Sequence, residues 1–219
     1  MMLGENATPE QIQAINHRLG IDKPLPQQYV TWLGKVCIGD FGRSYQDDRP
    51  ILPDLLDRMP ATLELMLAAV LIALCIGVPI GIASAVKRNS LLDNLGRIFA
   101  LIGVSMPNFW IGLVLILIFA KYLRLLPPSG NDSASSVILP ALALGLALSG
   151  ILMRMVRSSM LEVMKEDYLK TAMAKGLSKR IIILKHAFRN AVLPVITTIA
   201  LQIGNLLGAP GQRPHEAED

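Results

Sequence analysis

Long stretches without a single charged residue constrain this 219-residue chain more than any other feature of its sequence. Three such stretches are Leu65–Val86, 98–120 and 133–153. Each supplies the roughly 20 apolar residues that an α-helix needs to cross a bilayer. A further apolar run follows at 191–208. A soluble core helix is rarely this apolar on every face. The sequence therefore predicts an all-α fold, a polytopic bundle of membrane helices, with spans near 65–86, 98–120, 137–156 and 191–208.

The composition and the placement of charge agree with a membrane protein. Hydrophobic residues make up 52% of the chain, charged residues only 17%, and the mean hydropathy is +0.46. The net charge of +4 arises in particular loops, since nine basic side chains lie between Arg154 and Arg189 and three lie in 87–97. Because cytoplasmic loops carry such an excess, we expect 87–97 and 157–190 in the cytoplasm, and residues 1–60 and 125–136 on the other side.

The first 60 residues are more polar, and we expect them to form a small helical region outside the cytoplasm. The stretch 27–36 is amphipathic, with Tyr29, Trp32 and Leu33 on one face. A region of this size buries too little apolar surface for a strong core of its own. It is therefore expected to lie against the membrane domain at 61–208. The tail at 209–219 has no hydrophobic periodicity and is predicted to be disordered.

The segment from Asp167 to Pro194 is patterned as two short helices rather than as a simple loop. Good helix formers follow Asp167 and stop at Gly176, and Ser178 is a suitable N-cap for a second helix that should end at Leu193-Pro194. We predict a hairpin whose small-residue tip, from Ala172 to Gly176, is open to the backbone of a partner. The apolar stripe expected to lie on the body of the protein is formed by Ile181, Leu184 and Phe188.

This segment resembles the cytoplasmic coupling loop of ABC importer permeases, in the form found in dipeptide and oligopeptide transporters and in related nickel and glutathione transporters. The resemblance rests on an aspartate-tyrosine pair, a threonine-alanine pair, an alanine-lysine-glycine run and an asparagine-alanine-x-x-proline ending. It implies that this loop docks on the ATPase subunits and transmits their motion. The residues to which it assigns the coupling role are Asp167, Tyr168, Thr171, Ala172, Ala174, Lys175, Gly176, Arg189, Asn190 and Pro194.

Further motifs extend the resemblance over most of the chain: Leu19–Leu25, Gly39–Ser44, Pro60–Leu63 and Ser105–Pro107. The resemblance implies a permease subunit of the inner membrane that imports peptides by alternating access, with nickel or glutathione as other substrates. It also implies partners, namely ABC ATPase subunits, a second permease subunit, a periplasmic or lipid-anchored substrate-binding protein, and membrane lipid. ATP hydrolysis is then expected on the separate ATPase subunits, so the chain itself is not expected to be an enzyme.

Both ends depart from the family pattern, which places one transmembrane helix before the motif near residue 4 and another after residue 208. On this comparison the chain is expected to lack the first and last spans of the family. A truncated fragment that does not transport is one alternative. A secondary carrier or small channel is another, against which the large two-helix loop argues.

Polar residues inside the apolar runs are the candidates for a translocation path. Pro107 removes a backbone hydrogen bond and should kink the span at 98–120. Asn108 is too polar to face lipid, so it should face the bundle interior or a water-filled cavity. Hydrogen bonding between helices is an equally good role for such side chains. The path candidates are Ser105, Pro107, Asn108, Gln202 and Asn205, whereas Gly77, Gly81, Gly145 and Gly150 are expected to be close-packing positions.

Catalytic, cofactor and metal chemistry has little support in the sequence. Cys37 and Cys75 share no motif, and His17, His186 and His215 are scattered over separate regions. The chain has no glycine loop followed by Lys-Ser/Thr that would cradle phosphates. It also lacks the interleaved aromatic and basic residues of nucleic-acid binders. We therefore expect no catalytic residue, no cofactor, no metal site and no nucleic-acid partner.

Overall fold

The computed structural model of the chain describes residues 20–44, 49–128 and 134–208, with side chains up to Gly204. Within these residues the elements are helices, and the one β-type contact is an isolated bridge between Arg43 and Pro50. The predicted all-α fold is confirmed. In chain order the elements are α2 (Leu25–Cys37), α3 (Ile51–Val86), α4 (Leu91–Ser105), α5 (Asn108–Leu115), the π-helix η1 (Ile116–Tyr122), the short 3₁₀ helix η2 (Ala134–Val137), α6 (Ile138–Val163), α7 (Asp167–Ala174), α8 (Lys179–Ile181), the π-helix η3 (Ile182–Ala187) and α9 (Phe188–Gly208).

The chain divides into two compact units, Met1–Ala61 and Thr62–Asp219, with the boundary inside α3. In the first unit, α2 begins after Pro24, and the Gln28 side-chain nitrogen donates a hydrogen bond of 2.7 Å to the Lys23 carbonyl. No residue of α2 is buried. Residues 1–19 and the tail at 209–219 lie outside the described residues, so their predicted states stay predictions.

Three helical runs in the described residues are long and apolar enough to cross a membrane: α3, Ser135–Val163 and Lys179–Gly204. The pair formed by α4 and α5–η1 passes the same test, but its two halves are bent by 104° at a break after Ser105. Pro107 accounts for the break, because it has no N–H to donate and it forces Met106 into an extended conformation with ψ of 133°. The kink predicted at Pro107 is confirmed, and it divides the stretch 98–120 into two helices.

The membrane helices approach closely where small residues meet. A Cβ atom added at Gly77 of α3 would lie 2.7 Å from the backbone oxygen of Ser149 on α6. One added at Gly150 of α6 would lie 2.9 Å from the backbone oxygen of Ala100 on α4. Small residues let helix backbones pack against one another in this way. The expected close-packing role is confirmed for Gly77, Gly81, Gly145 and Gly150.

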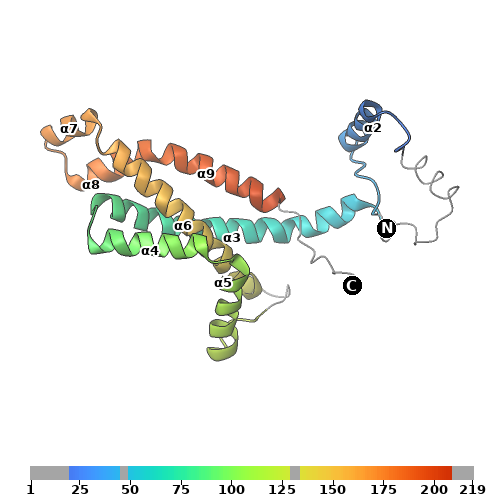
Figure 1. Cartoon of the computed structure of the whole chain (residues 1–219), viewed down its shortest axis with the longest axis horizontal. Coiled ribbons are helices and arrows are strands. Elements are labelled where there is room, and N and C mark those ends of the chain that lie inside the picture. The colour runs from blue at the N-terminus through green and yellow to red at the C-terminus, as the bar shows by residue number, and fades with distance from the viewer. Residues whose placement is uncertain (1–19, 45–48, 129–133, 209–219) are drawn as a thin grey trace. The chain divides into compact units, whose positions relative to one another are not determined.

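In the second unit α6 contacts both α4 and α9, and the hairpin made by α7 and α8 lies at the end where α6 stops (Figure 1). One buried apolar cluster runs from α6 into this hairpin. Val156 and Met160 contribute to it from α6, and Leu169 and Ala172 from α7. The hairpin is therefore anchored on the body of the protein through a core that is continuous with that of the membrane helices.

Candidate functional site

The first arm of the hairpin, α7, begins and ends at residues suited to those positions. Glu166 precedes it in an extended conformation, and Asp167 places a negative charge in its first turn, where the helix dipole favours one. Gly176 follows it with a φ of +76°, and its N–H donates to the Met173 carbonyl at 3.0 Å. The Leu177 N–H donates to the Ala172 carbonyl at 3.4 Å, which completes a Schellman motif. The predicted stop at Gly176 is confirmed.

The second arm begins as predicted, with Ser178 as the N-cap, but it does not end where the sequence suggested. The helical backbone continues from Lys179 through η3 and α9 to Gly208, with Pro194 inside α9. The expectation that Leu193-Pro194 ends this segment is therefore wrong. A proline breaks one helical hydrogen bond, and here the chain continues across it as a helix that leads into the last apolar run.

A polar contact joins the two arms. The Asn190 side-chain nitrogen lies 2.6 Å from the Tyr168 hydroxyl oxygen and donates a hydrogen bond to it. The Tyr168 hydroxyl in turn donates to the His186 backbone carbonyl at 3.3 Å. Two of the predicted coupling residues, Tyr168 and Asn190, are thus brought together across the hairpin. On the exposed side of α7, Asp167 pairs with Lys170 at 2.7 Å.

The buried face of the second arm differs from the predicted stripe. Ile181 and Leu184 are 43% and 48% exposed, whereas Ile182 and Ala187 are buried. The π-helical winding of η3 explains the difference, because a wide turn brings residues five apart onto one face instead of four apart. Of the three stripe residues only Phe188 packs against the buried cluster.

The tip of the hairpin is open at its turn but not along its whole length. Ala172 is only 7% exposed, since it packs into the buried cluster, so its predicted place on an accessible tip is wrong. Ala174, Lys175 and Gly176 are exposed, and a Cβ added at Gly176 would meet nothing within 4 Å. The other predicted coupling residues, Thr171, Arg189 and Pro194, are exposed as well. Apolar side chains flank the open turn on the surface: Met173, Leu177, Ile181 and Leu184.

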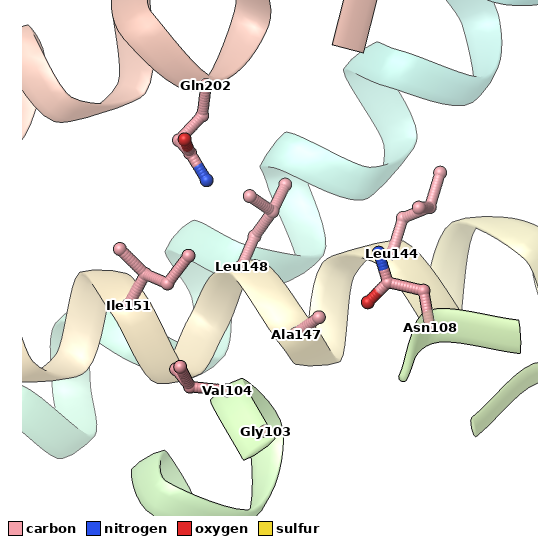
Figure 2. A pocket seen from close by; sticks show the side chains of 8 residues that line it. All are labelled: Gly103, Val104, Asn108, Leu144, Ala147, Leu148, Ile151 and Gln202. Atoms are coloured by element: carbon pink, nitrogen blue, oxygen red, sulfur yellow. The ribbon is translucent and has the colours of Figure 1, made fainter. Parts of the chain in front are cut away.

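A cavity of about 260 Å³, open to the surface on one side, lies among α4, α5, α6 and α9, and two of the path candidates line it, Gln202 and the exposed Asn108. Asn108 lines it from α5 and Gln202 from α9, with both amides shown among apolar side chains of α4 and α6 (Figure 2). The other described residues that line it are apolar or small: Gly103, Val104, Leu144, Ala147, Leu148 and Ile151. The lining thus contains two neutral primary amides, a group that can both donate and accept hydrogen bonds.

Two of the other path candidates, Ser105 and Pro107, are not among the described residues that line this cavity. Ser105 and Pro107 are exposed at the break between α4 and α5. The backbone of Asn205 belongs to α9, but its side chain lies outside the described residues. The sequence singled out Asn108 and Gln202 by their polarity in apolar runs, and their part in a translocation path stays a prediction.

A bidentate ion pair between Asp93 and Arg157 was not predicted from the sequence. The Arg157 Nε and Nη2 atoms lie 2.6 and 2.8 Å from the two carboxylate oxygens of Asp93, which is completely buried. Asp93 also accepts a hydrogen bond of 2.9 Å from the Asn89 N–H, and its own N–H donates to the Ser90 hydroxyl at 3.3 Å. The pair joins the two basic loops that were predicted to share one side of the membrane. The sequence offered one signal for this pair, because Asp93 is the acidic residue in a loop, 87–97, whose other charged residues are basic.

Helices long enough to span a membrane, a cavity among them and a protruding two-helix hairpin define a multi-pass membrane protein of the transport class. Residues 77–209 match the family described as binding-protein-dependent transport system inner membrane component, and residues 1–66 match the N-terminal family of the same systems. The chain belongs to this family of inner membrane transport components.

Known relatives of the chain are permeases. The dipeptide transport system permease protein DppB of Alkalihalophilus pseudofirmus is 40% identical, with 94% of this chain and 71% of the relative covered. The protein of the same name in Escherichia coli is 38% identical, with 94% and 70% covered. The glutathione transport system permease protein GsiC of Salmonella paratyphi A is 41% identical, with 95% and 68% covered. The resemblance to ABC importer permeases is confirmed, and the chain is a multi-pass permease subunit of the inner membrane.

Proposed function

We propose that this permease subunit carries peptides or similar small amide-containing solutes inward by alternating access, driven by separate ATPase subunits. The observation that carries the proposal is the cavity that Asn108 and Gln202 share. Peptide groups need donors and acceptors in equal measure, and primary amides supply both. The names of the relatives, which specify dipeptide and glutathione, support the same substrate class, because glutathione is itself a small peptide.

The cavity supports a peptide better than a bare metal ion such as nickel. The eight described residues that line it are apolar or amide-bearing, whereas imidazole is a ligand that suits nickel. A volume of about 260 Å³ is slightly below the range of about 300–1,000 Å³ that is common for small-molecule sites. A short peptide would therefore need the surrounding helices to move apart as it passes.

The hairpin is proposed as the element that couples this movement to the ATPase subunits. Its exposed turn at Ala174–Gly176 offers two small residues, Ala174 and Gly176, to a docking surface, and apolar side chains lie beside it. Its base is buried with α6, so a displacement of the turn would be carried into the membrane helices. The remaining partners follow from the family: a second permease subunit and a substrate-binding protein that delivers the solute.

The substrate proposal is tested in proteoliposomes that contain the chain with its cognate ATPases, second permease and binding protein. Asn108→Leu together with Gln202→Leu should lower kcat/KM for peptide uptake about tenfold or more, since each lost hydrogen bond contributes about 0.5–1.5 kcal/mol. Thr197→Val, which removes a hydroxyl from an exposed position on α9, is the control and should leave uptake unchanged. Unchanged uptake in the double variant would contradict the role of the cavity. No uptake by the unsubstituted chain would support the fragment alternative.

The coupling proposal is tested by Gly176→Trp, with Gly176→Ala as its matched control. Both variants place a side chain at a φ of +76°, but only tryptophan adds bulk to the open turn. We expect tryptophan to abolish uptake and stimulated ATP hydrolysis while the chain still inserts, and alanine to retain most of both activities. Normal uptake with tryptophan at this position would rule out docking through the turn.

A further inference from the structure

The Asp93–Arg157 ion pair occupies one end of the contact between α4 and α6. Asp93 lies in the first turn of α4, and Arg157 lies in the last two turns of α6. The guanidinium engages both carboxylate oxygens, at 2.6 and 2.8 Å, and Arg157 is only 20% exposed. A bidentate pair of this kind fixes both distance and orientation.

Elsewhere in the contact between α4 and α6, small residues bring the two backbones together, and the buried Met153 side chain of α6 lies against Gly96 of α4. A Cβ added at Gly103 would lie 3.2 Å from the Leu146 carbonyl, and one added at Gly150 would lie 2.9 Å from the Ala100 carbonyl. The approaches at Gly103 and Gly150 are of one backbone to another, and Met153 has a flexible, unbranched side chain. Such a surface resists separation of the helices but opposes axial sliding only weakly.

The two ends of α4 meet different parts of the protein. Asp93 lies at one end, and Gly103 and Val104, which line the cavity, lie at the other. Ten residues separate Asp93 from Gly103, which is about 15 Å along a helix. A displacement of α4 along its axis would therefore move the cavity wall and the break at Pro107 that follows it.

Arg157 stands on the part of α6 that carries the hairpin. Its neighbours Val156 and Met160 belong to the same buried cluster as Leu169 and Ala172 of α7. The hairpin and the end of α6 thus form one packed body, and Arg157 links that body to α4.

We infer that the Asp93–Arg157 pair fixes the axial register of α4 against α6, and so holds the cavity wall to the body that carries the hairpin. Asp93 and Arg157 are positioning residues in this role, since they act on the cavity through α4. The consequence for transport rests on the proposed function, whereas the register itself does not.

The axial register of α4 against α6 can be measured by disulfide cross-linking. The experiment uses membranes that contain the whole chain, in which Cys37 and Cys75 have been replaced. Val104→Cys is combined with Ile151→Cys in one version and with Ala147→Cys in the other. Ala147 and Ile151 lie one turn apart on α6, and both face the cavity that Val104 lines (Figure 2). The ratio of the two cross-linking yields therefore reports the axial position of α4.

The decisive variant combines Asp93→Asn with Arg157→Met. It leaves no unpaired buried charge, and the new amide oxygen can still accept from the Asn89 N–H, so the start of α4 keeps its cap. We expect the chain to insert in normal amounts and the cross-linking ratio to shift toward the pair that is disfavoured in the native register. An unchanged ratio in folded protein would overturn the inference.

Arg157→Lys provides a second measurement if the double variant fails to fold. Lysine keeps the charge but cannot form the bidentate contact, so the ratio should shift in the same direction and by less. An unchanged ratio here also counts against the inference.

Reconstitution with the partner subunits then separates this inference from the proposed function. The double variant should keep hydrolysing ATP while peptide uptake is lost, because the hairpin still docks but no longer sets the cavity wall. Full uptake together with a shifted cross-linking ratio would show that the register is irrelevant to transport, and would overturn the stated role. If the unsubstituted chain fails to import peptide, the proposed function fails, while the cross-linking ratio still decides the register.

Discussion

The contact between α4 and α6 and the hairpin beyond α6 are held together by opposite means. In the first, backbones approach so closely at Gly150 that an added Cβ would lie 2.9 Å from a carbonyl oxygen. In the second, large side chains such as Leu169 are buried at the base, while the turn at Gly176 meets nothing within 4 Å. The contact between α4 and α6 has no room for added atoms at Gly150, whereas the stability of the hairpin depends on the side chains buried at its base.

This contrast separates two kinds of sensitivity. Added volume should be most harmful in the helix contact, because neither backbone can retreat without separating the helices. Removed volume should be most harmful at the base of the hairpin, because it leaves a cavity in the buried cluster. Substitutions at the exposed turn should have little effect on folding, which leaves that surface available for a partner.

The largest effect is expected from Gly150→Val in the helix contact. The new side chain would collide with the backbone of α4, and we expect the free energy of unfolding to fall by about 3 kcal/mol. Far-ultraviolet circular dichroism in mixed detergent and SDS micelles measures it. Gly204→Val in α9 is the control, since its Cβ would meet nothing within 4 Å. Equal losses in the two variants would show that helix propensity, and not crowding, is responsible.

Leu169→Ala at the base of the hairpin should have the next largest effect. Leu169 is 1% exposed, and its truncation should cost about 2–3 kcal/mol. Amide hydrogen exchange in α7 reports the free energy of opening. Leu184→Ala, at a side chain 48% exposed, should change it by less than about 0.5 kcal/mol. Equal changes in the free energy of opening for Leu169→Ala and Leu184→Ala would contradict the view that the buried base stabilises the hairpin.

Tyr168→Phe removes the hydrogen-bonded link between the two arms. Loss of the contacts to Asn190 and to the His186 carbonyl should cost about 1–1.5 kcal/mol locally, because both groups are exposed and regain water. Trypsin should then cut faster at the lysines and arginine around the turn, Lys175, Lys179 and Arg180. Tyr122→Phe, in η1, should leave the cleavage rate as it is. Unaltered cleavage in the first variant would mean that the buried base alone holds the arms.

The smallest effect is expected at Gly176 itself. Alanine there should destabilise α7 by about 1 kcal/mol, the usual penalty for a left-handed backbone in a residue with a Cβ. Asparagine visits this conformation more readily, so Gly176→Asn should cost less than Gly176→Ala. Hydrogen exchange of α7 compares the two. A larger loss with asparagine would indicate that the turn is crowded and not open.

The sequence predicted the parts of the fold that depend on local patterns. Charge-free runs identified the apolar helices, and Pro107 identified the break, because a missing N–H acts within one turn. Gly176 and Ser178 marked the turn of the hairpin for the same reason. The polarity of Asn108 and Gln202 in apolar runs was enough to nominate them, although their common cavity depends on how α5 and α9 meet α6.

Features that depend on packing were not predictable in this way. Ile181, Ile182, Ile183 and Leu184 are all apolar, so the sequence could not tell which of them faces the core once η3 widens the turn. Ala172 is small enough for either an open tip or a tight contact, and only the position of α7 decides between them. The Asp93–Arg157 pair joins residues 64 apart in the chain, and its geometry follows from the approach of α4 to α6.

The wide turn η3 also keeps two faces of one continuous helix in phase. A regular α-helix advances by about 100° per residue, and a π-turn accommodates one residue more than an α-turn does. Deleting one residue between Ile182 and Ala187 would restore regular winding and leave these two buried residues four apart, still on one face. Related chains could therefore lose a residue here without turning the hairpin against α9, whereas a deletion in the regular part of α9 would rotate the hairpin arm by about 100°.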